Sequence, residues 1–439
     1  MHTVLHSREH FPLIVTRLRN IKINKHVSEL PACYLGHKRA PLVAMTAALE
    51  AGKFFLPLLI EYFKSRLFYM SLNLFRSKYS VLFFLASFFA LPGHSSTITV
   101  TPSEAQTQIQ ASINNSHSGD TISFQAGTYN LMGLRLAAGR TYLGSTSGQT
   151  IVHWRGGSAV MIFYGSGITV QHFIFDGGGL YLGGAVSDVH VEYNKFQNIA
   201  FGPNATNEFN NWTSTIGVFI DTSAANSDIS YNSFQNLSTQ ILSQNVDWNL
   251  GVTGIFGFNL NNVTITNNSF DTLNEGIHFF SGRNITITHN VITHFHRMAM
   301  EIQNNTGGLE IAYNTISQPL HPFWLTFGIS DAINTGGSNV HDNLLDDQTP
   351  QACGSGCWVG YGIEAFGSGT IIANNTVQGY WGNGVVIGPS KNLQVTGNHI
   401  CGPEMSKPGN QYVGHELIPH WSGEVVSNNT TSTSTVCGK

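Results

Sequence analysis

Two glutamates and one histidine occupy the same place in a short motif that recurs along the chain. The motif is a Gly or Ala, an apolar residue and then a variable residue, which is His278, Glu301 and Glu364 in three of its copies. Hydrolysis of a bond between two sugars needs an acid that protonates the leaving oxygen and a base that activates water. Because Glu301 and Glu364 could fill these roles, the three residues are the candidate catalytic group if the fold brings them together.

Strand geometry predicts that the fold does bring them together. Side chains of a strand alternate between two faces, so the apolar residue of each motif points inward and the variable residue points outward. Parallel strands in register would stack the outward residues at ~4.8 Å per coil. A shift of one residue would place Asp331 in this column instead of Ser330, so Asp331 is a fourth catalytic candidate. The predicted column contains Phe219, Phe256, His278, Glu301, Ser330, Glu364 and Val386.

Segments of variable length precede these motifs, and nearly every one carries an aromatic side chain. Five of the seven Trp residues of the chain lie in them, and the short segment 293–298 carries two histidines and an arginine. Sugar rings present apolar C–H faces that stack on indole rings, and sugar hydroxyls bond to acids and imidazoles. The predicted substrate-binding residues are Arg297, His296, Trp324, Trp358, Trp381, Trp248 and Trp212.

The motifs belong to a longer repeat that an asparagine marks. Residues 262–270 read Asn-Val-Thr-Ile-Thr-Asn-Asn-Ser-Phe, and residues 284–292 read Asn-Ile-Thr-Ile-Thr-His-Asn-Val-Ile. Each copy is an alternating strand, an Asn and a second short strand, which predicts a solenoid lengthened by insertions. We expect each Asn to turn the same corner in the left-handed backbone region and to bond to the Asn of the next coil. The marking positions are Asn194, Asn232, Asn268, Asn290, Asn314, Asn343, Asn375 and Asn398.

These repeats resemble those of the right-handed parallel β-helix, or pectin-lyase-like, superfamily of secreted carbohydrate-active proteins. The resemblance covers roughly residues 97–430 and implies an all-β, single-domain solenoid. Two signatures of the superfamily are absent: the Asn-Thr-Asp, Asp-Asp and Gly-His-Gly set of polygalacturonases and the Asp-Pro-His of β-helix epimerases. The resemblance therefore indicates the fold and leaves substrate and reaction open.

The two ends of the predicted solenoid differ from its middle. A short amphipathic helix over 103–114 would cover the open first coil, because terminal repeats need a cap. Its apolar side would contain Ala105, Ile109, Ala111 and Ile113. We expect the β-helix to occupy residues 97–400, followed by an irregular, disulfide-tied tail over 401–439.

The front of the chain differs from the rest in charge. Residues 1–69 hold ten Lys and Arg against four Asp and Glu, whereas residues 96–439 hold nine against twenty-one, a formal net of 9 − 21 = −12. The net negative charge of residues 96–439 argues against nucleic acid and anionic membranes as partners. The basic residues 1–69 are interpreted as a dispensable extension.

Residues 70–96 have the three-part layout of a secretory signal peptide. Two basic residues follow Met70, then comes the apolar run 81–91, and small residues stand at Gly93 and Ser95, which predicts cleavage near 95–96. The apolar run is too short to serve as an integral membrane anchor. We therefore expect a protein that is secreted, extracellular or periplasmic.

Four cysteines lie in the exported part. An even number in an exported chain suggests disulfides, with Cys353–Cys357 closing one loop and Cys401–Cys437 closing the C-terminal tail. A zinc site would need a second close pair of ligands, which the sequence does not offer. No metal ligands are therefore assigned.

Three functions remain open at this level. The first is a glycoside hydrolase, a monomer acting on a neutral or weakly charged polysaccharide without a cofactor. The second is a polysaccharide lyase, which must neutralise a uronate with Ca²⁺ or with Arg or Lys, and such cations near the column are few. The third is a non-catalytic adhesin or glycan-binding β-helix. In that case Glu301 and Glu364 would be solvated acids on an exposed strand face.

Overall fold

The computed structural model describes residues 95–154, 159–199, 216–237, 252–320, 327–332, 336–349, 361–365, 367–381, 383–387, 391–402, 412–413 and 423–438. The expectations for residues 1–69, for most of the signal peptide and for Cys353–Cys357 lie outside these ranges. Among the described residues, no helix has the length and apolar character needed to cross a membrane.

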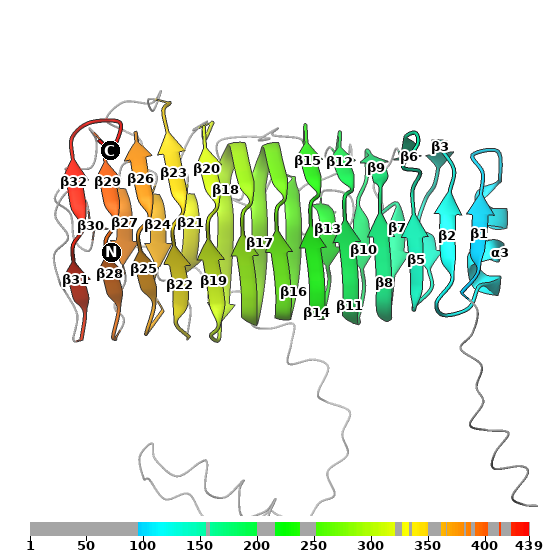
Figure 1. The fold of residues 1–439 in the computed structure, drawn as a ribbon, viewed down its shortest axis with the longest axis horizontal. Helices are drawn as coiled ribbons and strands as arrows, with labels where there is room; N and C mark the ends of the chain where they lie inside the picture. Colours follow the sequence, from blue (N-terminus) through cyan, green and yellow to red (C-terminus); the bar gives the residue numbers. More distant parts are fainter. Residues whose placement is uncertain are drawn as a thin grey trace, which may run out of the picture. The chain divides into compact units, whose positions relative to one another are not determined.

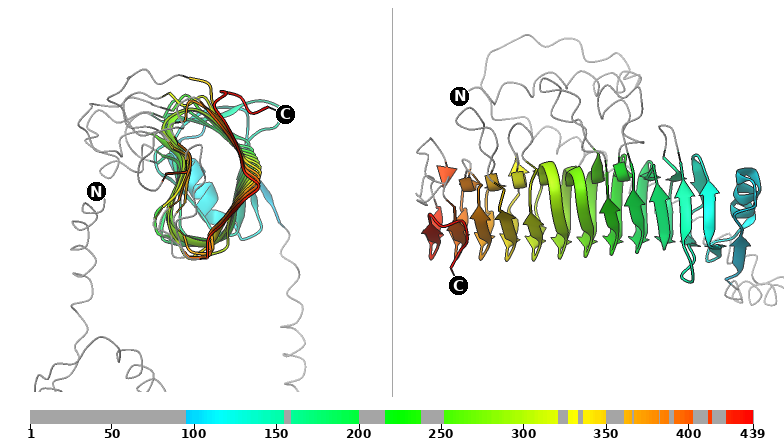
Figure 2. Two further views of the ribbon diagram at one scale, coloured as in Figure 1. Left: turned by 90° about the vertical axis from the view of Figure 1, so that its left-hand side faces the viewer. Right: turned by 90° about the horizontal axis from the view of Figure 1, so that it is seen from above.

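The described strands form a solenoid with three strands per coil, so that three stacks of strands run along its axis (Figures 1 and 2). Pairing is parallel throughout the stacks, which confirms the predicted all-β parallel solenoid. Stack A contains β4 (Leu134–Leu136), β7 (Met161–Phe163), β10 (Leu180–Leu182), β13 (Ile216–Ile220), β21 (Phe327–Ala332), β24 (Tyr361–Ala365) and β27 (Asn383–Ile387).

The other two stacks follow stack A in each coil. Stack B contains β1 (Thr97–Val100), β2 (Thr121–Phe124), β5 (Arg140–Leu143), β8 (Ser166–Gln171), β11 (Ala185–Glu192), β14 (Ser223–Ser230), β19 (Leu309–Ala312), β22 (Ser338–His341), β25 (Ile371–Ala373), β28 (Gln394–Thr396) and β31 (Val425–Ser427). Stack C contains β3 (Gly127–Asn130), β6 (Thr150–His153), β9 (Phe173–Asp176), β12 (Lys195–Gln197), β15 (Ser233–Gln235), β20 (Thr315–Ser317), β23 (Leu344–Asp347), β26 (Thr376–Gly379), β29 (His399–Cys401) and β32 (Thr430–Ser432). Three long strands turn corners and serve more than one stack: β16 (Thr253–Thr266), β17 (Ser269–Thr288) and β18 (Val291–Asn305).

A ladder of buried asparagines forms the corner between stacks B and C, as predicted. The Asn290 side chain illustrates it: Oδ1 accepts from the backbone N and the Nδ2 of Asn268, both at 3.0 Å. Its Nδ2 donates to the carbonyls of Ile265 and Thr288 and to Oδ1 of Asn314. The same bonds continue from coil to coil up to Asn429, one step beyond the predicted ladder. Each buried amide is therefore fully used in holding neighbouring coils in register.

The left-handed backbone at this corner lies one residue earlier than expected. Tyr193, Tyr231, His289 and Tyr313, each directly before a ladder Asn, have φ between 56° and 58°. The ladder asparagines are not among the residues with positive φ. The corner thus turns at the preceding residue, and the Asn is selected for its buried amide bonds.

Apolar side chains fill the inside of the solenoid. Phe175, Phe196, Phe234 and Phe270 stack face to face along stack C, with ring centroids 4.6–4.8 Å apart. The predicted inward residues of stack A are buried as well, and those described are Val218, Ile255, Ile277, Met300, Ile329, Ile363 and Val385. Burial of this continuous core is the main stabilising term of the fold.

Helix α3 (Gln106–Asn115) lies at the N-terminal end of the solenoid, close to the predicted range (Figure 1). Ile109 and Ile113 join the core as expected, whereas Ala105 and Ala111 are exposed. Two glutamines of α3 also bond to the edge of the sheet: the Gln110 amide pairs with both the N–H and the carbonyl of Arg135 in β4. Gln106 pairs in the same way with Met132. The helix therefore satisfies backbone groups that a further coil would otherwise bind.

The C-terminal tail is more regular than the sequence indicates. Strands β31 and β32 pair in parallel with β28 and β29, so residues 425–432 continue the solenoid and the boundary at 400 is too early. The ladder bond from Asn398 to Asn429 explains this continuation. Cys401 and Cys437 lie together as the predicted pairing requires, with a Cα–Cα distance of 5.4 Å. Strand β30 (Tyr412–Val413) adds to β27 in antiparallel direction.

Replacing Asn290 with Ala should destabilise the protein strongly. The variant loses the amide bonds to two coils and leaves buried backbone groups unsatisfied, so we expect a loss of about 3 kcal/mol in the free energy of unfolding. Chemical denaturation measures the loss. Asn339→Ala is the matched control, because Asn339 lies half-buried on the outward side of β22, and should change stability by less than about 0.5 kcal/mol. If both variants lose the same free energy of unfolding, the ladder bonds contribute no more to stability than an ordinary surface side chain does.

Candidate functional site

The predicted outward column exists in stack A. Phe219 pairs with Phe256, Phe256 with His278, and His278 with Glu301. The register continues from Glu301 through Ser330 and Glu364 to Val386. Glu301 and Glu364 are therefore two coils apart, with Ser330 between them.

The column is covered, in contrast to the exposed face that the sequence suggested. His278 is 2 % exposed and Glu301 is 6 % exposed, and Ser330 and Phe256 are also buried. These values exclude the interpretation of Glu301 as a solvated surface acid. A buried carboxylate must have partners, because isolated charges are costly away from water.

Four ionisable side chains form one buried network around His278. His278 Nδ1 lies 2.8 Å from Glu275 Oε2 and 3.6 Å from Glu301 Oε2. Arg297 binds Glu275 Oε1 and also lies 3.4 Å from Glu301 Oε2. Gln303 donates to the other oxygen of Glu301. Two carboxylates are thus balanced by a guanidinium and an imidazole.

Local backbone irregularities position this network. The pairing of β17 with β18 shifts register between Leu273 and Glu275, where β18 carries one extra residue. This bulge lies beside Arg297, and bulges commonly re-aim side chains. At Gly276 a Cβ atom would lie 2.6 Å from the carbonyl oxygen of Ala299, so no other residue fits there. Glu275 was not among the predicted site residues, because strand alternation alone does not bring residues three apart together.

The network sets the ionisation of its members. Burial alone would raise the pKa of Glu275, but the charges of Arg297 and His278 outweigh it and lower this pKa to about 2. Burial alone would lower the pKa of His278, but the charges of Glu301 and Glu275 raise it above its usual range. Glu275 is therefore a carboxylate that lies within hydrogen-bond distance of His278 Nδ1, while the buried His278 Nε2 has no hydrogen-bond partner among the described residues.

Glu364 lies in the opposite electrostatic environment. Burial and, to a lesser extent, the charge of Glu301 raise its pKa to about 7, although a hydrogen bond from Ser330 opposes the shift. Ser330 Oγ donates to Glu364 Oε2 at 2.7 Å. The column thus carries one acid with cationic partners and one acid that keeps its proton up to neutral pH.

Asp331 does not join the column. It pairs with Ile302 and Ala365, which are fully buried core residues, so its side chain points into the solenoid. Burial raises its pKa to about 7, with a smaller contribution from the charge of Glu364, while a hydrogen bond with Ser338 acts in the other direction. The register that places Ser330 outward places Asp331 inward, and the catalytic role considered for Asp331 is wrong on this geometry.

The predicted substrate-binding residues that the structure describes lie in different environments. Arg297 joins the network, and burial lowers the pKa of the neighbouring His296 to about 4. Trp381 is fully buried in the main core, so it cannot stack on a ligand at the surface. Four further predicted residues lie outside the described part of the chain: Trp212, Trp248, Trp324 and Trp358.

Aromatic rings continue the column on the N-terminal side of His278. Phe256 lies edge-on to the imidazole at 4.8 Å, and Phe280 lies 4.7 Å from it. Phe258 stacks on Phe280, and Phe219 packs against Phe256. The outward face of stack A therefore changes from apolar to ionisable at His278.

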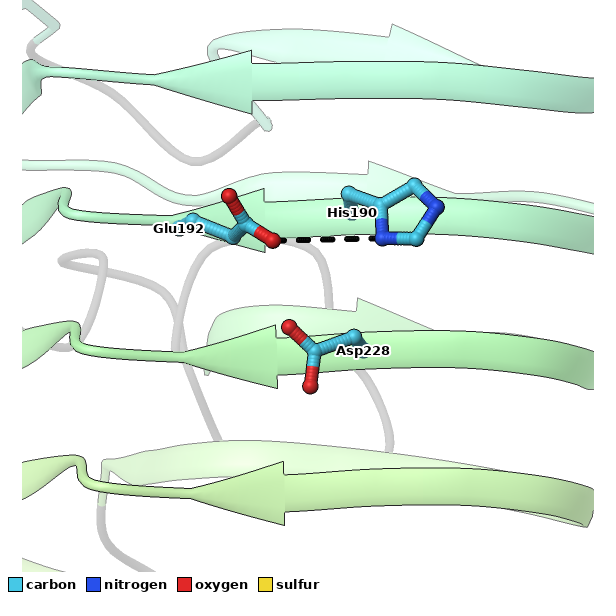
Figure 3. Close-up of side chains that lie close together, drawn as sticks. All are labelled: His190, Glu192 and Asp228. Atoms are coloured by element: carbon cyan, nitrogen blue, oxygen red, sulfur yellow. Dashed lines mark ion pairs between the residues drawn. The ribbon is translucent and has the colours of Figure 1, made fainter.

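Two groups of His and acidic side chains have donor atoms within 4.8 Å of one another in the described chain. One is Glu275, His278 and Glu301, where Arg297 already supplies the positive charge. The other is His190, Glu192 and Asp228 on β11 and β14 (Figure 3). Its two acids already accept hydrogen bonds from Gln171 and Ser230. Neither geometry assigns a metal.

Comparison with solved structures defines the fold. A surface adhesin of Streptococcus pneumoniae, PfbA, superimposes with a TM-score of 0.51 at 12 % identity, over 77 % of this chain and 90 % of that one. The fold is the right-handed parallel β-helix. DFA-IIIase from Arthrobacter chlorophenolicus A6 (TM-score 0.45, 13 % identity, 78 % and 86 % coverage) and a mannuronic-acid-specific family 6 polysaccharide lyase from human gut microbiota (0.42, 10 %, 77 % and 87 %) also match. No protein-family model and no curated protein sequence matches the chain. At 12 % identity the likeness to the adhesin is one of fold alone.

Replacing Asp331 with Asn should remove a pH-dependent destabilisation. A carboxyl whose folded pKa is raised from 3.8 to about 7 binds its proton more tightly when folded, so stability falls as pH rises from about 4 to 7. A shift of this size corresponds to roughly 4 kcal/mol above pH 7. We expect Asp331→Asn to be more stable than the wild type at pH 8 and similar at pH 5, by urea unfolding. Because Glu364 titrates in the same range, Glu364→Gln should be measured in parallel. A variant that is less stable than the wild type at pH 8 would contradict the buried acid.

Proposed function

We propose that this β-helix protein is a glycoside hydrolase that cleaves a neutral polysaccharide with inversion at the anomeric carbon. The observation that carries the proposal is the placement of Glu301 and Glu364 two coils apart in one outward column, with Glu301 beside Arg297 and with the pKa of Glu364 raised to about 7. Two carboxyl groups in unlike environments are how enzymes assign acid and base roles.

Glu364 fits the role of general acid. Its pKa of about 7 keeps the carboxyl protonated at neutral pH, and Ser330 orients one of its oxygens. A proton on the second oxygen could pass to the leaving sugar oxygen. The ideal pKa of a general acid lies near the working pH, which this environment provides.

Glu301 fits the role of general base. Arg297, Gln303 and His278 lie around its oxygens and orient the carboxyl group in the column. Two coils separate it from Glu364, roughly 9–10 Å along the column at ~4.8 Å per coil. Small inclinations of the side chains bring that spacing into the range of about 6.5–9.5 Å that leaves room for a water molecule in inverting enzymes.

The charge of the central coils favours a neutral substrate. Between Lys195 and Lys391 the chain has two Lys or Arg residues, Arg283 and Arg297, and thirteen Asp or Glu residues. Arg297 is engaged by Glu275 and Glu301, and Arg283 is exposed on another stack beside Asn261. A uronate would find no uncommitted Lys or Arg here, which argues against the lyase reading unless Ca²⁺ supplies the charge.

A non-catalytic glycan-binding role is the second candidate, since a relative in fold is a surface adhesin. The buried network argues for chemistry, because ionisable groups with strongly shifted pKa values cluster at functional sites. A binding surface has no need for an acid such as Glu364, whose pKa is raised to about 7.

Replacing either glutamate with Gln should abolish most hydrolysis. Gln keeps size and hydrogen bonding but removes the ionisable group, so we expect Glu301→Gln and Glu364→Gln each to lower kcat by about 10²–10⁴. Activity is measured as new reducing ends on a polysaccharide panel, with ultraviolet absorbance recorded to detect an unsaturated lyase product. Glu310→Gln is the control, because Glu310 is a half-exposed acid of β19. Unchanged rates in both variants on a cleaved substrate would reject the assignment.

The pH profile should distinguish the two roles. The rate of the wild type should fall as pH rises above about 7, because Glu364 must carry a proton to act as an acid. A substrate with a good leaving group needs no proton, so Glu364→Gln should recover much of its loss on an aryl glycoside. Glu301→Gln should not recover. If both variants lose equally on the two kinds of substrate, Glu364 is not the acid.

A further inference from the structure

Ser96, directly after the predicted signal-peptide cleavage point, is bound by a buried carboxylate. The backbone N and the Oγ of Ser96 both lie 2.8 Å from Oδ1 of Asp120. Asp120 is 3 % exposed and its other oxygen accepts from the backbone N of His117 at 2.7 Å. Ser96 is also joined to the sheet, because its carbonyl accepts from Thr121 N. One buried acid therefore contacts the point where the solenoid starts.

The sequence around Ser96 fits cleavage of the preceding peptide bond. Small residues at Gly93 and Ser95 stand three residues and one residue before that bond, after the apolar run 81–91. Ser95 and Ser96 are exposed, so a peptidase can reach the bond. The first strand, β1, begins one residue later at Thr97. Cleavage at this bond would remove the leader without removing any strand.

We propose that a leader peptidase cleaves the Ser95–Ser96 bond and that Asp120 is the binding site for the new α-ammonium group of Ser96. Hydrolysis adds one water across the peptide bond, which leaves a carboxylate on Ser95 and an amine on Ser96. In the uncleaved chain Asp120 accepts from a neutral amide. After cleavage the same oxygen accepts from a cation, and charge-assisted hydrogen bonds of this kind are roughly twice as strong as neutral ones. Processing thus stabilises the first coil.

The charges near Asp120 support this role. Hydrogen bonds from His117 and Ser96 lower the pKa of Asp120 to about 2, so the carboxylate is ionised at any working pH. His117 Nδ1 is 3.9 Å from Asp120 and its side chain is 90 % exposed, so its charge is a weak competitor. Arg140 on the adjacent strand is directed to Ser116 instead. Neither of these two described cations neutralises Asp120, so the α-ammonium group would supply its counter-charge.

The test begins with the protein that is exported from cells expressing the full-length chain. Its N-terminal residue, determined by Edman degradation or mass spectrometry, should be Ser96. The pKa of its α-amine, measured by NMR after selective labelling of the N-terminus, should lie above the ordinary range of about 7.7–8.0. A different first residue, or an amine pKa within or below that range, overturns the proposal without the need for any variant.

Two variants then test the contribution to stability. A raised amine pKa stabilises the fold below about pH 8, and this contribution disappears as pH rises through the folded pKa. Asp120→Asn should therefore lower the midpoint of thermal unfolding by on the order of 2 °C at pH 7 and by less at pH 10. Insertion of one Ala between Ser95 and Ser96 moves the amine off Asp120 and should remove the same pH dependence while Asp120 stays in place. His117→Gln is the control and should retain it. If both test variants lower the midpoint of thermal unfolding equally at pH 7 and at pH 10, an ammonium group is not the partner of Asp120.

Discussion

The amide-to-amide bonds of the buried asparagine ladder determine the register on which the rest of this structure depends. Each ladder Asn accepts with Oδ1 from the previous coil and donates with Nδ2 to the coil beyond it. These amides are buried, so an unmade bond would cost about 1–3 kcal/mol. A slip of one residue in any coil would break the bonds and also turn every apolar side chain outward. Two independent terms, hydrogen bonding at the corner and burial of the core, therefore select the same register.

This register brings side chains that are far apart in the sequence together in one site. Residues 23 and 34 positions apart become neighbours at one strand spacing, as His278 and Glu301 or Ser330 and Glu364 do. Because the column is covered, its charges need internal balance, which Arg297 and His278 provide for Glu275 and Glu301. Removing one member of such a network leaves an uncompensated buried charge, which typically costs 3–5 kcal/mol. The network therefore holds its own geometry rigid beside Glu364.

Asp331 and Glu364 show how one sheet separates two acids onto its two faces. They lie on adjacent strands of stack A, with Asp331 directed into the core and Glu364 directed outward. Burial is the main reason that both pKa values rise to about 7, and the charge of Glu364 raises that of Asp331 further. Ionisation of both at high pH is thus unfavourable, and the outward acid keeps its proton in the range where a general acid works. The inward Asp331 has Ser338 as a polar partner.

The sequence by itself determined the repeat, the Asn corner and the members of the outward column. This was possible because parallel coils stack on one another, so that residues at equivalent positions of the repeat become neighbours in space. Only the tertiary structure decided that the column is buried, that Trp381 lies in the core and that residues 425–432 add coil strands. It also decided the inward direction of Asp331, since the sequence allowed two registers. The position of Glu275 depends on a one-residue bulge in β18 and on the bonds of its side chain to His278 and Arg297. The contact with Arg297 joins adjacent coils and the contact with His278 lies within one strand, and the repeat period of the sequence predicts neither.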